Sequence, residues 1–221
     1  MFPSVEPLIG SRLSMASDQE PSSAMTDICN DSAVLRKKEL RKHYRNQRHK
    51  QPLRITALDR LVLDEVGQWA LHASSEAWLG LYWPLPGEID LRFLRNHYNI
   101  ALPCSSQDGS MVFRPWGQSA LQPDGCGIPA PCGDGALSAS DLFLMLVPAL
   151  AMDRHGIRLG YGGGFYDRLR AQTEWRAVPA LVVIEAAFLK ETALPRDAWD
   201  VAFDGWITEQ GAGRPGIPAA S

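Results

Sequence analysis

A glycine-rich stretch carries the clearest arrangement of residues that could do chemistry. Residues 158–167 read RLGYGGGFYD, with four glycines between positions 160 and 164, directly after a strongly apolar run. Successive glycines let backbone N–H groups converge on an anion, and the start of a following helix adds positive charge. Arg158 would supply a cation and Asp167 a carboxylate for Mg²⁺. A plain glycine-rich turn fits the same residues, and the stretch alone does not decide between a phosphate cradle and a turn.

Neither of the two common nucleotide-binding motifs is present. The dinucleotide pattern G-x-G-x-x-G fails because the sixth position counted from Gly160 is Phe165. A P-loop needs Lys followed by Ser or Thr after its last glycine, and no glycine in the chain is followed in this way. A phosphate site in this stretch would therefore be of another kind.

Cysteine and histidine give no support for a metal centre or a nucleophile. The four cysteines form no C-x-x-C pair, and the five histidines show no H-E-x-x-H spacing. We therefore expect free thiols in a reducing cytoplasm and no metal held by Cys or His. No Ser-His or Cys-His arrangement suggests covalent catalysis.

The elements that must position this stretch alternate between helical and apolar strand patterns. Residues 33–50, 53–74 and 89–98 read as helices, whereas 77–83, 141–153 and 180–185 read as buried strands. Residues 115–140 are rich in Gly, Pro and Ser and read as a long loop. Strands that are apolar throughout indicate a sheet covered on both faces. We predict a three-layer α/β sandwich with a mostly parallel sheet and helices on both faces, and ligands bind at the carboxyl ends of strands in such folds.

Composition bounds the class of protein and its partners. The chain has 221 residues, 45% hydrophobic and 21% charged, with a net charge of -3, so its overall charge gives no case for nucleic-acid or membrane binding. We expect a disordered extension at 1–32, a single domain at 33–210 and a flexible tail at 211–221. The N-terminus does not resemble a signal peptide, translation could start at Met1 or Met25, and we expect a cytoplasmic protein.

Four separated segments resemble one known family. LVPALAMDRHGIRLGYGGGFYDR at 146–168 is similar to the signature of the 5-formyltetrahydrofolate cyclo-ligases, also called methenyltetrahydrofolate synthetases. RKKELRKHYRNQR at 36–48, YWPLPGEID at 82–90 and LPRDAWDVAFDGWITE at 194–209 resemble further segments of the family, in the same order. The resemblance covers roughly residues 34–210. It implies an enzyme of one-carbon metabolism that catalyses the ATP- and Mg²⁺-dependent cyclisation of 5-formyltetrahydrofolate to 5,10-methenyltetrahydrofolate. Such an enzyme uses no protein nucleophile.

The resemblance also implies roles for individual residues. Glu88 and Trp83, with Tyr161, would bind the folate, although a carboxylate at position 88 could equally be a favourable helix start. Asp167 and Asp200 would hold Mg²⁺. Asp204 could instead be a carboxylate at the end of a strand, without a role in the site. The residues implied to act in catalysis are Lys37, Arg158 and Tyr166. Those implied to bind ATP are Lys37, Lys38, Arg41, Arg158, Leu159, Gly160, Tyr161, Gly162, Gly163, Gly164, Phe165 and Tyr166.

The chain departs from the family pattern inside the signature. Phe165 replaces the first tyrosine of Y-Y-D, and Tyr161 and Gly163 stand where some members carry Arg and Lys. A nucleotide- or RNA-binding module without catalysis, or a family paralogue with another substrate, is the alternative function. The implied partner is the small molecule 5-formyltetrahydrofolate, and no protein partner follows from the sequence.

Overall fold

A seven-stranded sheet forms the centre of the computed structural model, which describes residues 23–50, 53–118, 120–133, 135–197 and 200–216, with side chains from Val34 on. The strand order is β12-β11-β9-β6-β1-β2-β3, and the five strands from β11 to β2 run parallel. The edge strands β3 and β12 are antiparallel to their neighbours. The strands are β1 (Trp78–Gly80), β2 (Ile100–Ser105), β3 (Met111–Pro115), β6 (Leu142–Val147), β9 (Ala180–Val183), β11 (Gly205–Thr208) and β12 (Gly211–Gly213).

Alternate residues of the central strands enter two separate cores. Leu144 and Leu146 of β6 pack on the face covered by α2 (Thr56–Ala70), whereas Met145 and Val147 join the core on the other face. Both faces are therefore buried, which explains why these strands are apolar throughout. The predicted α/β class and its covered, mostly parallel sheet are confirmed.

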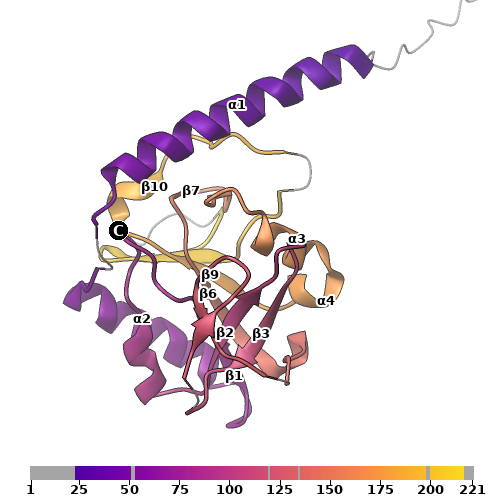
Figure 1. Ribbon diagram of the computed structural model, residues 1–221. Helices are drawn as coiled ribbons and strands as arrows, with labels where there is room; N and C mark the ends of the chain where they lie inside the picture. The colour runs from indigo at the N-terminus through magenta and orange to yellow at the C-terminus, as the bar shows by residue number, and fades with distance from the viewer. Residues whose placement is uncertain (1–22, 51–52, 119, 134, 198–199, 217–221) are drawn as a thin grey trace, which may run out of the picture.

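The second face is covered by more than helices. It carries α1 (Ser23–Gln47), α3 (Phe165–Ala171), α4 (Thr173–Arg176) and a small sheet of order β10-β7-β8. The small sheet consists of β7 (Ala151–Asp153), β8 (Arg158–Leu159) and β10 (Leu189–Lys190). Figure 1 shows α1 along one side of the domain, next to β10 and β7.

Three segments differ from the sequence-based expectation. The single strand expected at 141–153 is two strands, because Pro148, which has no N–H to donate, follows β6 and the chain then moves to the small sheet as β7. The helix expected at 89–98 is a short 3-10 helix, η1 (Arg92–Asn96). The loop expected at 115–140 contains a hairpin of β4 (Gln122–Pro123) and β5 (Pro129–Ala130), and the 3-10 helix η2 (Ala139–Asp141).

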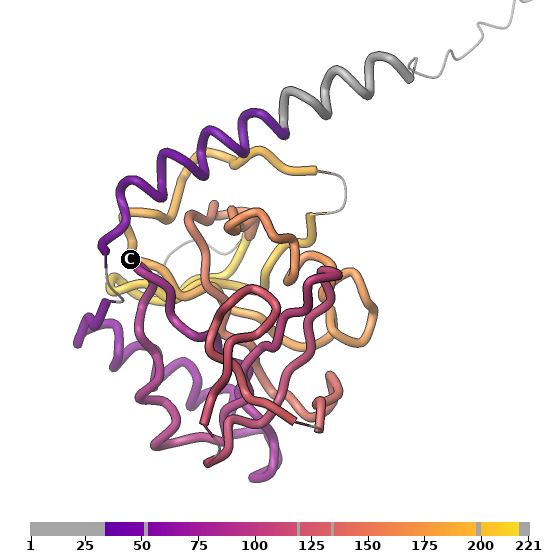
Figure 2. Tube along the Cα trace, in the orientation of Figure 1, coloured from indigo at the N-terminus to yellow at the C-terminus, as the bar shows by residue number. Residues whose placement is uncertain are grey.

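The ordered chain extends beyond the domain bounds expected from the sequence. Helix α1 begins at Ser23, ahead of residue 33, and Gly211–Gly213 pair with β11 as an edge strand instead of belonging to a flexible tail. Residues 1–22 and 217–221 lie outside the described part, so the expectations for them stay predictions. Figure 2 shows a yellow-orange segment running beside α1, and Lys37 of α1 donates a hydrogen bond to Asp197, so distant parts of the sequence meet there. No helix within the described ranges is long and apolar enough to cross a membrane.

Candidate active site

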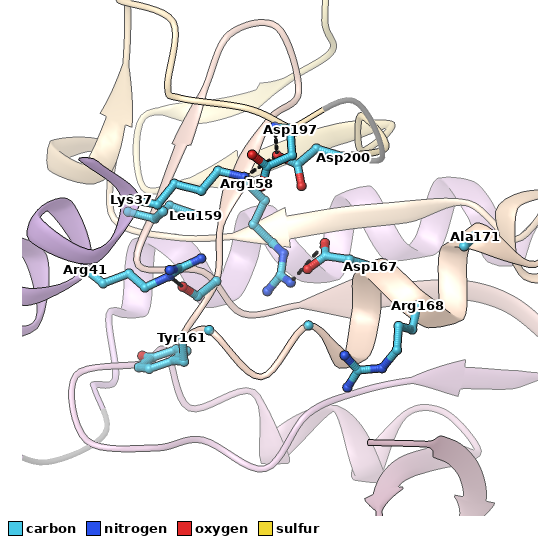
Figure 3. A pocket seen from close by; sticks show the side chains of 13 residues that line it. Lys37, Arg41, Arg158, Leu159, Tyr161, Asp167, Arg168, Ala171, Asp197 and Asp200 are labelled. Atoms are coloured by element: carbon cyan, nitrogen blue, oxygen red, sulfur yellow. Dashed lines mark hydrogen bonds and ion pairs between the residues drawn. The ribbon is translucent and has the colours of Figure 1, made fainter. Parts of the chain in front are cut away.

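Two cavities lie side by side and share the glycine-rich loop. One, of about 350 Å³, is lined by charged side chains, and we call it the charged cavity (Figure 3). The other, of about 260 Å³, is lined mainly by apolar side chains, and we call it the apolar cavity. Arg158, Tyr161 and Gly164 line both. The loop predicted to do chemistry therefore forms the wall between two binding spaces.

Three arginines donate hydrogen bonds to backbone carbonyl oxygens of the glycine-rich loop. Arg41 Nε donates to the carbonyl oxygen of Gly160 over 3.1 Å, and Arg45 donates to that of Tyr161. On the other side, Arg168 Nη2 donates to the carbonyl oxygen of Gly163 over 2.7 Å. These contacts place cations against the backbone oxygens that would otherwise repel a phosphate. Helix α3 has 7 residues, so the guanidinium groups, more than the helix dipole, give the loop its positive field.

Arg158 crosses from one cavity to the other. Its Nη1 donates to the carbonyl oxygen of Pro148 over 2.9 Å, and its Nη2 lies 3.7 Å from Oδ1 of Asp167. The side chain is only 6% exposed, and its guanidinium lies 5.1 Å from the centre of the Tyr166 ring. A Cβ at Gly160 would lie 2.9 Å from Nη2, so the glycine leaves room for the guanidinium in this position against the loop.

Lys37 reaches from α1 into the charged cavity and meets two carboxylates. Its Nζ donates to Asp197 over 2.6 Å and to Asp200 over 2.5 Å, and the residue is 7% exposed (Figure 3). One ammonium facing two carboxylates leaves an excess negative charge. Oδ1 of Asp197 is buried and has no hydrogen-bond partner among the described residues. A cation could therefore still be accommodated beside this pair.

Sequence reasoning selected Asp200 and overlooked Asp197. Both lie in the LPRDAWD segment, three residues apart, and the backbone N–H of Asp197 donates to Asp200 Oδ2 over 2.8 Å. That spacing places two carboxylates on one turn, a signal the sequence did contain. Within the described ranges no three His, Cys, Asp or Glu side chains form a metal-holding group. Mg²⁺ needs fewer protein ligands, because it is commonly held by one or two carboxylates together with substrate phosphates.

The apolar cavity contains a buried carboxyl group, that of Glu88. Glu88 is 3% exposed, and its Oε2 accepts a hydrogen bond from the backbone N–H of Leu85 over 2.7 Å. Its Oε1 is buried without a hydrogen-bond partner in the described part of the chain. Burial raises the pKa of this carboxyl above its usual range. Trp83, Met111 and Phe165 supply apolar wall around it.

Two tyrosine hydroxyls are buried beside the same cavity. The hydroxyl of Tyr166 has no hydrogen-bond partner among the residues that the structure describes, and that of Tyr161 makes no hydrogen bond of ordinary geometry, although it lies beside the Glu88 carboxyl group. Burial raises the pKa of both phenols, and the charge of Glu88 raises the pKa of Tyr161 further, so both remain protonated donors at neutral pH. Buried polar atoms normally find a partner. These hydroxyls and Oε1 of Glu88 are therefore the atoms that a polar ligand would satisfy.

The structure divides the predicted ATP-binding residues between the cavities. Leu159, Gly160 and Gly162 line the charged cavity with Lys37 and Arg41, whereas Gly163, Phe165 and Tyr166 line the apolar one. Lys38 is exposed and borders an open groove beside the charged cavity. The predicted metal ligands Asp167 and Asp200 line the charged cavity, and Trp83, Glu88 and Tyr161 line the apolar one. Their functional roles remain predictions.

Asp204 contacts residues that belong to the fold and not to either cavity. Its Oδ2 accepts from the backbone N–H of Ala180 over 2.8 Å and lies 3.3 Å from Nη2 of buried Arg170. It lines neither cavity. The strand-end interpretation therefore fits this residue.

Comparisons with known proteins agree on one family. Residues 87–209 match the model of the 5-formyltetrahydrofolate cyclo-ligase family. The 5-formyltetrahydrofolate cyclo-ligase of Mycolicibacterium smegmatis is 33% identical over 132 residues, which cover 56% of this chain and 67% of that protein. The Escherichia coli K12 enzyme of the same name is 33% identical over 73 residues, 33% of this chain and 39% of that protein.

Two solved structures share the fold. The NMR structure of Aquifex aeolicus 5,10-methenyltetrahydrofolate synthetase matches with a TM-score of 0.61 and 25% identity, over 84% of this chain and 95% of that one. A 5,10-methenyltetrahydrofolate synthetase from Mycoplasma pneumoniae matches with a TM-score of 0.53 and 21% identity, over 78% of this chain and 98% of that one. The second likeness shows the fold alone. Lys37, Arg41 and Trp83 lie before the region matched by the family model.

Proposed function

The chain belongs to the 5-formyltetrahydrofolate cyclo-ligase family, and from this premise we propose that it converts 5-formyltetrahydrofolate and ATP to 5,10-methenyltetrahydrofolate, ADP and phosphate. The observation that carries the proposal is the shared loop. Arg158, Tyr161 and Gly164 border a charged cavity on one side and an apolar cavity on the other. A reaction between a nucleotide phosphate and a flat heterocycle needs two such spaces in contact.

The charged cavity is proposed to bind the triphosphate of ATP. Arg41, Arg158 and Arg168 line it, and guanidinium groups bind phosphate oxygens well because their donors are arranged as a planar fork. Asp200 and Asp167 are the proposed Mg²⁺ ligands, with Asp197 as an added candidate beside Asp200. When bound with ATP, the metal would offset phosphate charge. Lys37, now held by Asp197 and Asp200, would then be released toward the phosphates.

The apolar cavity is proposed to bind the folate ring system. Trp83 and Phe165 offer ring surfaces, and Glu88 offers a carboxyl oxygen without a protein partner. A pterin presents N–H donors that a carboxylate accepts, and its flat face stacks on aromatic rings. The tyrosine hydroxyls of 161 and 166 would donate to oxygens of the bound folate.

The proposed reaction then needs mainly positioning. The formyl oxygen attacks the γ-phosphorus of ATP, so an O–P bond forms and ADP leaves. The neighbouring N10 attacks the formyl carbon, the C–O bond breaks, phosphate departs with the formyl oxygen, and the N10 proton is released. Both steps join groups held side by side, which is where enzymes gain most from orientation. Arg158 borders both cavities and would stabilise charge on the transferred phosphoryl group.

An absorbance assay tests the proposal. Purified protein is mixed with ATP, Mg²⁺ and 5-formyltetrahydrofolate, and the near-ultraviolet absorbance of the methenyl product is followed. We expect product only when all three are present, and ADP in equal amount. Nucleotide binding without product, or RNA binding that weakens with salt, would contradict the proposal and favour a binding module.

A further inference from the structure

Arg168 makes two contacts that the proposed chemistry does not use. It lies in α3, one residue after Asp167, and its side chain reaches back over the loop (Figure 3). Its Nε donates to the carbonyl oxygen of Gly109 over 2.9 Å, and its Nη2 donates to that of Gly163 over 2.7 Å. Gly109 lies in the turn between β2 and β3, so one guanidinium joins two segments that are far apart in the sequence.

Two glycines lie against the guanidinium of Arg168, whose side chain is exposed. A Cβ at Gly109 would lie 2.8 Å from Nη2, and a Cβ at Gly164 would lie 2.8 Å from Nη1. Both glycines have positive φ, +88° and +67°, which other residues rarely adopt. The ring of Phe165 lies 5.2 Å from the guanidinium carbon. A lysine could not fill this place, because its ammonium is a single point with no planar fork.

The two segments that Arg168 joins belong to different walls. The glycine loop separates the cavities, and Arg168 itself lines the charged one. The β2–β3 hairpin contributes Pro103, Ser105 and Met111 to the apolar cavity only. Arg168 therefore connects the glycine loop, which borders both cavities, to the hairpin that lines the apolar cavity.

We propose that Arg168 is a positioning residue that couples the two cavities, so that nucleotide and folate each strengthen the binding of the other. The proposal rests on the proposed function. A ligand in either cavity fixes the glycine loop, and the Gly163–Arg168–Gly109 bridge extends that order to the hairpin. The second ligand then meets walls that are already ordered and loses less conformational entropy on binding. The coupling must be the same in both directions, because it is a difference of binding free energies.

Calorimetric titration tests the coupling. The dissociation constant of the β,γ-imido analogue of ATP with Mg²⁺ is measured with and without 5-formyltetrahydrofolate, and the reverse titration is run as well. We expect each ligand to tighten the other at least about fivefold in the wild-type protein, the low end of usual coupling. Arg168→Lys should give an intermediate factor and Arg168→Ala a factor of about one, since Arg168 donates from two separate nitrogens, Nε and Nη2, and a lysine has one nitrogen in place of this planar fork.

Two further variants separate positioning from simple structural damage. Gly109→Ala disturbs the hydrogen bond between Arg168 and the hairpin, and it should also abolish the coupling. Arg154→Ala removes an arginine that lines neither cavity and pairs with Glu191 at the surface, and it should leave the factor unchanged. Hydrogen exchange gives a second readout: nucleotide should protect residues 106–110 in the wild type and not in Arg168→Ala.

The outcomes are distinct. A wild-type protein without coupling, or an unchanged factor in Arg168→Ala and Gly109→Ala, overturns the inference while leaving the proposed function standing. If Arg168→Ala does not fold by circular dichroism, the factor in Arg168→Lys decides: a wild-type value overturns the inference. A protein that binds neither ligand contradicts the proposed function itself. A merely structural role would weaken both single-ligand affinities and leave their ratio as in the wild type.

Discussion

The two cavities on either side of the glycine loop treat their polar groups in opposite ways. In the charged cavity the charges face protein partners: Lys37 meets Asp197 and Asp200, and Arg41 holds a backbone carbonyl. In the apolar cavity, Oε1 of Glu88 and the hydroxyl of Tyr166 are buried and make no hydrogen bond of ordinary geometry with the described residues. Apart from Oδ1 of Asp197 and Nε of Arg158, the charged groups named here have partners in the protein, whereas the apolar cavity keeps a buried carboxyl oxygen and a buried hydroxyl without one in the described part of the chain.

This difference between the cavities predicts how each ligand binds. A nucleotide entering the charged cavity must exchange with existing ion pairs, so its affinity should depend on salt and on divalent cations. A folate entering the apolar cavity completes hydrogen bonds that the protein lacks, and the gain is large because buried unsatisfied groups are unfavourable. Four substitutions test the two cavities together and one at a time.

Arg158→Ala should have the largest effect, because this side chain serves both cavities. We expect kcat/KM to fall about 10²–10³-fold for ATP and for folate alike, the usual loss when a group that stabilises developing charge is removed. Steady-state kinetics measure it, with Arg154→Ala as the matched arginine control. Turnover within about threefold of wild type would remove Arg158 from the chemistry.

Glu88→Gln should affect the apolar cavity alone. We expect KM for folate to rise about tenfold to a hundredfold, the effect of a charge-assisted hydrogen bond worth roughly 1.5–3 kcal/mol, with KM for ATP unchanged. In the wild type, KM for folate should rise as pH falls through the raised pKa of Glu88, and this rise should be absent in the variant. Equal increases in both KM values would show that the cavities are not separate in function.

The same substitution should stabilise the protein without ligand. Because burial raises the pKa of Glu88, the folded protein retains a proton that the unfolded chain has released as pH rises above the usual glutamate range. Stability contributed by this group therefore falls as pH rises through that window, and Gln removes the loss. Thermal unfolding at neutral pH should show a higher Tm for Glu88→Gln than for wild type. A lower Tm would mean that the carboxylate is satisfied in the fold.

Asp200→Asn should act on the charged cavity alone. Removing one carboxylate weakens the hold on Lys37, so ATP without Mg²⁺ should bind more tightly, while the gain from adding Mg²⁺ should fall. We expect the ratio of ATP dissociation constants without and with Mg²⁺ to drop about tenfold, equal to roughly 1.4 kcal/mol. Asp204→Asn, at a carboxylate that lines neither cavity, is the matched control. A ratio equal to wild type would exclude Asp200 as a metal ligand.

Phe165→Tyr should have the smallest effect. The variant restores the hydroxyl of the family signature at a residue that lines the apolar cavity. One added neutral hydrogen bond changes binding by about 0.5–1.5 kcal/mol at most, so kcat and both KM values should stay within roughly threefold to tenfold of wild type. A larger gain in kcat would mean that the replacement of Tyr by Phe had altered the chemistry.

The sequence was most informative where function depends on a continuous segment. The glycine loop, Arg158 and Asp167 were identified because loop, cation and carboxylate lie within ten residues. The division of that loop between two cavities was not predictable, because consecutive residues border different cavities: Gly162 lines one and Gly163 the other. Whether a residue faces one cavity or the other depends on backbone dihedral angles that the amino-acid sequence alone does not specify.

The fold was predictable in class and less so in detail. Apolar strands gave the covered sheet, since burial on both faces requires them. The break after β6 at Pro148 and the edge strand β12 depend on which distant strands are available for pairing, as does the pairing of Lys37 with Asp197 across 160 residues of sequence. Such long-range partners follow from topology and not from local propensity.

A crystal structure with the β,γ-imido analogue of ATP, Mg²⁺ and 5-formyltetrahydrofolate tests the central claim most directly. We predict phosphates in the charged cavity, the pterin against Glu88 in the apolar cavity, and the γ-phosphate facing the formyl oxygen beside Arg158. A pterin in the charged cavity, or two ligands that do not meet at the glycine loop, would contradict it.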